Sequence, residues 1–278
     1  MGHLRDRMDA DLRLAGRSEP TRNTYIGCVE LFVKHSMRSP TELGEEEVRQ
    51  FMLYIVDEKK LSVGRQLQYV GALKFLYGVT LRRPEVTAGL PWPKRTWREP
   101  NAPTREEVAR ILDAVKDPFW RVFCTTAYAS GLRRMEVAHL RAEHIDSCSG
   151  LICVVNGKGN KRRKVRLEPQ MLTMLRDHWR YQRLPGPWLF PSPFGQRPIS
   201  LSAASRAFRR AAIRAGLGSY KLHNLRHAFA THLLEEGVDL VTLQVLLGHS
   251  RIKTTARYTK IRTDRIRATP ALLSKLPT

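Results

Sequence analysis

HNLRHAFATHLL, residues 223–234, contains three histidines and one arginine on a segment with the apolar spacing of a helix. His223 and Arg226 are three residues apart and share one face of such a helix. A metal site would need a supporting carboxylate or cysteine, which the segment lacks, and the arginine would repel a divalent cation. A guanidinium beside a titratable imidazole suits an anion instead. We therefore expect His223 and Arg226 to bind an anion, and His227 and His232 mainly to pack.

The overall charge indicates a polyanionic partner. The 278 residues include 48 lysines and arginines against 26 aspartates and glutamates, which gives a formal net charge of +22. Few soluble proteins tolerate that self-repulsion without a polyanion. Nucleic acid is the expected partner, and an acidic membrane surface is the weaker alternative.

Nothing in the sequence predicts membrane insertion or secretion. No uninterrupted apolar run approaches the ~18 residues of a membrane span, and the charged N-terminus lacks the apolar stretch of a secretory signal. We expect a cytoplasmic, nucleoid-associated protein with no membrane partner. The cysteines are scattered without a CxxC pair, which predicts reduced thiols rather than a disulfide frame or a zinc site. They are Cys28, Cys124, Cys148 and Cys153.

Apolar periodicity predicts a helical N-terminal domain followed by a linker. Helix spacing recurs over residues 18–36, 41–60 and 62–79, with Thr41 as the expected N-cap of the second helix. The segment PEVTAGLPWPKRTWREPNAPT (84–104) then combines frequent prolines with almost no periodicity, which is typical of a domain boundary. We assign residues 1–92 to the helical domain and residues 93–103 to the linker.

The remaining residues, 104–278, predict a second domain with one hairpin. A helix starts behind Thr104 as N-cap, and a more buried helix ends at Gly131. LICVVNGKGNKRRKVRL (151–167) contains β-branched residues, a glycine-rich turn and then alternating basic and apolar residues, the pattern of a hairpin. The rest, to about Tyr258, is helical. The fold class is mainly α with a small β-sheet, in two domains, the second of them α+β.

Four further residues have side chains suited to chemistry, each with an ordinary alternative. Lys158 lies between two glycines at the hairpin tip, where an ammonium could donate a proton, although a basic turn can simply be a solvated loop. Arg133 follows Gly131, and Glu136 one turn later could orient it, although a surface ion pair has the same spacing. Tyr258 lies in a basic segment, where a tyrosine usually only packs.

Taken in order, these residues resemble one family. Arg133, Lys158, His223-x-x-Arg226, Leu-Gly-His249 and Tyr258 occur in the order found in tyrosine site-specific recombinases, the phage-integrase and Xer group. The matching stretches are GLRRMEV (131–137), GKGNKRR (157–163), HNLRHAFATHLL (223–234), LLGHS (246–250) and TTARYT (254–259). Every active-site position of the family is present, and the GLR alignment selects Arg133 rather than Arg134. Residues 18–90 resemble the family's helical, SAM-like core-binding domain more loosely.

The resemblance implies a covalent mechanism. In the family, the tyrosine, here Tyr258, attacks a DNA phosphate to form a 3′-phosphotyrosyl bond and free a 5′-hydroxyl. His223 would accept the phenolic proton, and Lys158 would protonate the departing oxygen. Arg133 and Arg226 would hold the two non-bridging oxygens and stabilise the transition state. The family uses neither a metal ion nor ATP, so no cofactor is expected.

The resemblance also implies supporting residues and partners. His249 would hydrogen-bond the phosphate, and Glu136 would fix Arg133. The family acts on double-stranded DNA with specific recombination sites, as four protomers that pass through a Holliday junction. The tail segment ALLSKL (271–276) is the apolar stretch that could dock into a neighbouring protomer. The expected DNA contacts of the hairpin are Lys161, Arg162, Arg163 and Lys164.

Three rival functions share parts of this pattern. A type IB topoisomerase uses a similar residue set to relax DNA, but the compact helical N-terminal half favours a recombinase. A metal-dependent tyrosine relaxase needs a His-x-His pair, which the sequence lacks. A catalytically idle DNA-binding protein is disfavoured by the complete set of active-site residues.

Overall fold

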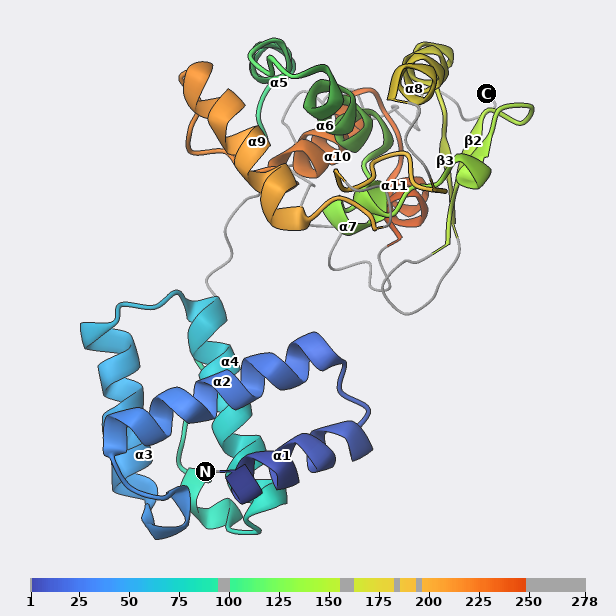
Figure 1. Cartoon of the computed structure of the whole chain (residues 1–278). Coiled ribbons are helices and arrows are strands. Elements are labelled where there is room, and N and C mark those ends of the chain that lie inside the picture. Colours follow the sequence, from blue (N-terminus) through green and yellow to red (C-terminus); the bar gives the residue numbers. More distant parts are fainter. Residues whose placement is uncertain (1, 95–100, 156–162, 183–185, 194–196, 249–278) are drawn as a thin grey trace, which may run out of the picture. The chain divides into compact units, whose positions relative to one another are not determined.

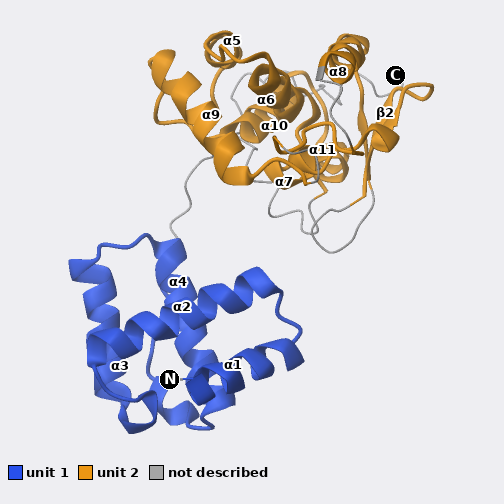
Figure 2. Cartoon of the chain, in the orientation of Figure 1, with its two compact units in different colours: residues 1–97 blue, residues 98–278 orange. Residues whose placement is uncertain are grey.

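Two compact units make up the chain. The computed structural model describes residues 2–94, 101–155, 163–182, 186–193 and 197–248. Unit 1 spans Met1–Trp97 and unit 2 spans Arg98–Thr278 (Figure 2). Each unit has its own hydrophobic core. The division between the units lies within the proline-rich segment 84–104.

Unit 1 is a helical bundle. Its α-helices are α1 (Gly2–Leu14), α2 (Glu19–Ser36), α3 (Glu45–Leu53) and α4 (Val63–Phe75) (Figure 1). Wider π-helical turns continue α3 over Tyr54–Glu58 and α4 over Leu76–Thr80, and 3-10 turns occupy Pro40–Glu42 and Pro84–Thr87. The three predicted helices are confirmed, and α1 is additional. It buries Met8 and Leu12 in the core of the unit.

The start of α3 differs from the sequence-based prediction. The helix begins at Glu45, after Gly44, and Thr41 lies in the preceding 3-10 turn instead of capping the helix. The Thr41 hydroxyl lies 2.7 Å from Ser39 Oγ. The exposed N-terminal end is capped from inside the helix, because Glu47 Oε2 accepts a hydrogen bond from the Gly44 N–H at 2.8 Å.

Unit 2 contains seven α-helices and a small sheet among its described residues. Thr104 caps the first helix as predicted: its hydroxyl accepts from the Glu107 N–H at 3.2 Å, and Glu107 Oε2 accepts from the Thr104 N–H at 2.9 Å. A 3-10 turn covers Ala142–His144. The α-helices are α5 (Arg105–Asp113), α6 (Pro118–Ser130), α7 (Arg134–Ala138), α8 (Pro169–Gln182), α9 (Leu201–Arg214), α10 (His223–Glu235) and α11 (Leu240–Leu247).

Helix α6 forms the centre of unit 2. It packs against α5, α7, α8, α9 and α10, and α10 in turn packs against α11 (Figure 1). The core at these contacts includes the fully buried rings of Phe123, Phe190 and Phe208, together with Leu225 of α10. This packing fixes the N-terminal end of α10 and the C-terminal ends of α6 and α11, where the functional residues lie. None of the described helices of either unit is long and apolar enough to span a membrane.

The sheet is antiparallel, in the order β1 (Ile145–Asp146), β2 (Leu151–Val154) and β3 (Arg163–Arg166). The predicted hairpin of β2 and β3 is confirmed, and β1 adds a two-residue edge strand. In β3, Val165 is buried and Arg163 is half-buried, whereas Lys164 and Arg166 are exposed. The alternation therefore turns Arg163 toward the interior of the unit, where β3 contacts α11.

The cysteines are free thiols, as expected. Burial raises the pKa of Cys28 to about 11 and that of Cys124 to about 12. These two side chains therefore stay protonated at neutral pH and act as small apolar core residues.

Candidate active site

The turn after α6 places Arg133. Helix α6 ends at Gly131, whose φ of +60° lies in the left-handed region that favours glycine. A Cβ at this position would collide with the ring of Phe229 on α10. The chain then reverses into α7 with Arg133 as its N-cap residue. The predicted helix end at Gly131 is confirmed, and the position requires a glycine for both conformation and space.

The carboxylate of Glu136 lies at the centre of a group of arginines. Its Oε1 accepts from Arg133 Nη1 at 2.9 Å and its Oε2 from the Arg133 backbone N–H at 2.7 Å. Arg163 adds a bidentate pair, Nη1 to Oε1 at 2.8 Å and Nη2 to Oε2 at 2.6 Å. Arg226 Nη1 lies 3.9 Å from Oε2. We call these four residues the arginine–carboxylate cluster.

The same arginines cap the C-terminal end of α11. Three successive carbonyl groups at this end each accept a hydrogen bond from a different arginine of the cluster. Such carbonyls have no partner within the helix, and the negative end of the helix dipole favours cations. The cluster therefore joins α7, β3, α10 and α11 at one point. The pairs are Arg163 Nε to Leu246 O (2.8 Å), Arg226 Nη2 to Leu247 O (2.5 Å) and Arg133 Nη2 to Gly248 O (3.0 Å).

The cluster has an excess of positive charge. Burial alone would raise the pKa of Glu136, but the hydrogen bonds and charge of Arg163, with the hydrogen bonds from Arg133, outweigh it and lower the pKa to about 2. Three guanidinium groups against one ionised carboxylate leave a net charge of +2. The Arg133 side chain is 26% exposed, whereas those of Arg163 and Arg226 are 6% and 3% exposed. An anion would therefore approach the cluster on the side of Arg133.

His223 lies beside this charge, at the first residue of α10. The residue is exposed to solvent, but desolvation by the surrounding protein, followed by the charges of Arg226, Arg134 and Arg133, lowers the pKa of its ring below the ordinary value. A neutral imidazole at neutral pH can accept a proton. The ring of His227 packs edge-on against that of His223, with centroids 4.7 Å apart.

His232 is buried, as the sequence analysis expected. Its Nδ1 lies 2.9 Å from the hydroxyl of Tyr128, across the contact between α10 and α6. Of the three histidines of α10, only His223 combines an exposed ring with the charge of the cluster. Within the described residues, no group of three or more histidine, cysteine, aspartate or glutamate side chains is arranged to hold a metal ion.

The structure thus brings together Arg133, Glu136 and Arg226, with His223 next to them. Several other predicted site residues lie outside the described residues: Lys158, Lys161, Arg162, His249, Tyr258 and the tail segment 271–276. Of the expected DNA contacts of the hairpin, Arg163 and Lys164 are described, and Lys164 is exposed on β3.

Comparison with known proteins identifies the family. Residues 103–265 match the Phage integrase family, and residues 4–85 match its N-terminal SAM-like domain. A putative integrase/recombinase of Sinorhizobium fredii is 39% identical, over 100% of this chain and 90% of the relative. The tyrosine recombinase XerD of Rhizobium meliloti is 30% identical, over 81% of this chain and 79% of the relative. This chain belongs to the tyrosine site-specific recombinases of the phage integrase family.

Solved structures have the same fold. A lambda integrase tetramer bound to a Holliday junction superposes with a TM-score of 0.77 and 19% identity, over 93% of this chain and 77% of the other. Members of the family are DNA strand-transfer enzymes, and this recombinase is such an enzyme, acting in site-specific DNA recombination.

The placement of Arg163 in the recombinase corrects one expectation. The run of basic residues 161–164 predicts Arg163 as a DNA contact, but its guanidinium is turned inward onto Glu136 and Leu246. An available signal was the period-two alternation of the strand, which puts Arg163 on the same face as the apolar Val165. The sequence alone does not show what the inward guanidinium would pair with.

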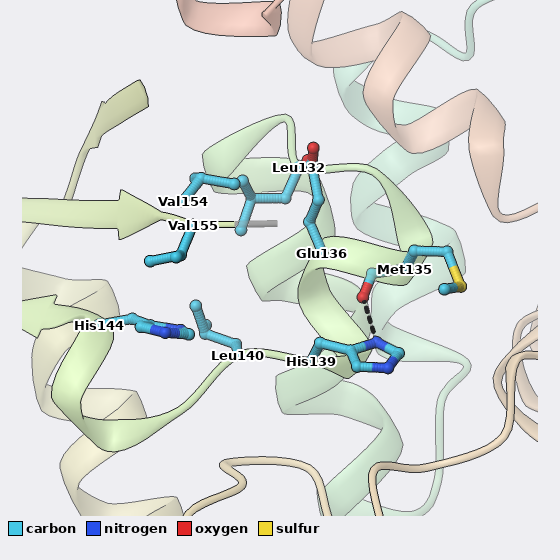
Figure 3. Close-up of a pocket in the computed structure, with 8 residues that line it drawn as sticks. All are labelled: Leu132, Met135, Glu136, His139, Leu140, His144, Val154 and Val155. Carbon is cyan, nitrogen blue, oxygen red and sulfur yellow. Dashed lines mark hydrogen bonds between the residues drawn. The ribbon is translucent and has the colours of Figure 1, made fainter. Parts of the chain in front are cut away.

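A cavity of about 200 Å³ lies on another side of Glu136. Apolar side chains line much of it, and His139 and His144 lie at its far end from the oxygens of Glu136 (Figure 3). The ring of His139 is held by its own helix, because Nδ1 lies 2.8 Å from Met135 O. In this view the Glu136 carboxylate points away from both histidines. The arginines, rather than these histidines, set the electrostatics of Glu136. The lining residues are Leu132, Met135, Glu136, His139, Leu140, His144, Val154 and Val155.

Proposed function

We propose that the recombinase cleaves DNA with Tyr258 as nucleophile, forms a 3′-phosphotyrosyl intermediate, and exchanges strands through a Holliday junction. The observation that carries the proposal is the arginine–carboxylate cluster: three guanidinium groups around one carboxylate, with net charge +2 and Arg133 reaching solvent. It lies beside a histidine whose pKa is lowered. An anion acted on by acid–base chemistry fits this arrangement.

The charge of the cluster suits the transition state. A phosphodiester has one negative charge, and attack by an oxyanion adds a second in the pentavalent state. Arg133 and Arg226 bind the two non-bridging oxygens. The net charge of +2 on the cluster therefore balances the two negative charges of the pentavalent transition state. Glu136 holds Arg133 through both its side chain and its backbone N–H. These guanidinium groups are already fixed in the protein, so little reorganisation is needed during the reaction.

Proton transfer completes the scheme. A tyrosine hydroxyl has a pKa of about 10, so Tyr258 needs a base at neutral pH. His223, neutral because of its lowered pKa, accepts that proton. Lys158 protonates the departing 5′-oxygen, and His249 donates a hydrogen bond to the phosphate. The P–O5′ bond is replaced by a P–O bond to Tyr258 of similar energy, so a 5′-hydroxyl of the second duplex can reverse the step without ATP. The guanidinium groups supply the positive charge that a metal ion would otherwise supply.

The positive charge of the protein supports the proposed DNA contacts, and its family supports the proposed assembly. Lys161, Arg162 and Lys164 of the hairpin contact backbone phosphates, and the formal net charge of +22 attracts the duplex. Four protomers act on two duplexes that contain specific recombination sites. The lambda integrase tetramer on a Holliday junction, a structural neighbour, supports this assembly.

A single substitution tests the proposal. Tyr258→Phe removes only the nucleophilic oxygen, so we expect unchanged DNA affinity and no covalent protein–DNA adduct on a gel run under denaturing conditions. Tyr181→Phe is the matched control, because Tyr181 is 82% exposed on α8, a helix that contributes no residue to the cluster, and the adduct of this variant should persist. An adduct formed by the Tyr258→Phe protein would refute the assignment. Relaxation of plasmids without any preferred site would favour a type IB topoisomerase activity instead.

A further inference from the structure

The inward-facing Arg163 is not among the catalytic residues of the proposed mechanism. We propose that Arg163 is a positioning residue for strand exchange: one guanidinium holds the Glu136 carboxylate, the end of α11 and strand β3 in a fixed relation. The inference rests on the proposed function, since the groups that Arg163 would position are those assigned there.

All three nitrogens of Arg163 have a defined partner. Nη1 and Nη2 donate to the two oxygens of Glu136 at 2.8 and 2.6 Å, and Nε donates to Leu246 O at 2.8 Å. The side chain is only 6% exposed. The Arg163 side chain also packs closely against Gly248, because a Cβ added to that glycine would lie 2.9 Å from Arg163 Cδ. A planar fork with donors in fixed directions determines orientation as well as distance, which an ammonium cannot do.

Each partner of Arg163 lies next to a proposed catalytic group. Glu136 holds Arg133, and Leu246 precedes His249 by three residues along the chain. Arg163 itself begins β3, five residues after Lys158 in the hairpin. A displacement of about 1 Å in such a framework can cost a reaction on the order of 100-fold, because the reacting groups lose alignment.

Arg163 also determines what Arg133 can do. With Arg163 in place, Glu136 has a bidentate cation of its own, and the 26% exposed side chain of Arg133 keeps a surface for the phosphate. Without Arg163, the buried carboxylate would depend on Arg133 and Arg226 alone and would draw them away from the phosphate. This division separates Arg163, which orients Glu136, from Arg133, whose exposed side is available to the phosphate.

The test compares two variants with a matched control. Arg163→Met removes the charge and the fork, and Arg163→Lys keeps the charge but loses the fork. Arg166→Met, on the exposed face of the same strand, removes the same charge without touching Glu136. Single-turnover cleavage is measured at saturating DNA, together with DNA affinity. We expect both Arg163 variants to bind DNA within about threefold of the parent protein and to cleave on the order of 100-fold more slowly, with cleavage unchanged in Arg166→Met.

A kinetic double-mutant cycle with Glu136→Gln separates positioning from a general effect on folding. If Arg163 acts through Glu136, the two losses are not additive, and the double variant is about as slow as the slower single variant. The inference is overturned if Arg163→Lys cleaves within threefold of the parent, if the losses multiply, or if both Arg163 variants lose DNA binding. If Arg163→Met does not fold, Arg163→Lys decides. Failure of the proposed function shows separately, as an adduct that survives Tyr258→Phe.

Discussion

Replacement of Glu136 by glutamine keeps the shape of the side chain and removes its charge. In the native protein the carboxylate is 3% exposed, and its pKa is about 2 against an ordinary value of 4.5. That difference corresponds to about 3 kcal/mol of stability at neutral pH, at about 1.4 kcal/mol per pKa unit. Glu136→Gln should therefore lower the free energy of unfolding at pH 7 by about 3 kcal/mol, because it leaves buried guanidinium groups without a counter-ion.

The pH dependence follows from the direction of the shift. Because the pKa of Glu136 is lower in the folded state, its contribution is fully present above the unfolded pKa and is lost as the pH falls from about 4.5 toward 2. The difference in unfolding free energy between the parent protein and the glutamine variant should thus shrink by about 1 kcal/mol between pH 7 and pH 4.

Urea unfolding of the full chain at the two pH values measures this difference. Glu136 lies in unit 2, so the unfolding transition that includes this unit should move. Glu143→Gln is the control, because its carboxylate is 64% exposed and pairs with Arg141 at the surface, where a change below about 0.5 kcal/mol is expected. A loss below 1 kcal/mol for Glu136→Gln at pH 7, or the same loss at both pH values, would contradict the electrostatic account of the cluster.

Three further substitutions test separate parts of the structure. Gly131→Ala places a Cβ against Phe229 in a left-handed turn, so unit 2 should lose about 2 kcal/mol or more of unfolding free energy, and a fully stable variant would contradict the turn. Thr104→Ala removes the cap of α5 and should cost about 1 kcal/mol in urea unfolding, whereas no change would mean that the capping box does not matter. Lys158→Ala should slow cleavage by roughly 100-fold or more, and a 5′-bridging sulfur substrate should restore the rate; absence of rescue in a folded variant would remove Lys158 as the acid.

Local sequence patterns predicted the parts of the site that depend on neighbours in the chain. Gly131 as a helix end, Thr104 as a cap, and the pairing of Glu136 with Arg133 all involve residues three or fewer positions apart, or a single backbone conformation. The hairpin was predictable because β-branched apolar residues precede a glycine-rich turn in the sequence and alternating basic and apolar residues follow it. Interactions of this kind leave a short-range signal that composition and spacing reveal.

The long-range parts of the site left no such signal. Arg163 reaches Glu136, 27 residues away, and the backbone of Leu246, 83 residues away. The alternation of the strand is compatible with an inward-facing Arg163, but the basic residues around it suggested a DNA contact instead. Three arginines cap α11 by donating to backbone carbonyls. Every residue has such a carbonyl, so the sequence does not show which ones act as acceptors. Thr41 does not cap α3, because the helix begins only at Glu45 and the Gly44 N–H donates to the Glu47 carboxylate instead.

Identification of the DNA-linked side chain tests the account most directly. The recombinase is trapped on a nicked recombination-site substrate, the complex is digested, and mass spectrometry locates the peptide that carries the nucleotide. We expect a 3′-phosphate joined to the phenolic oxygen of Tyr258. A nucleotide on any other residue, or complete cleavage without a covalent peptide, would contradict it.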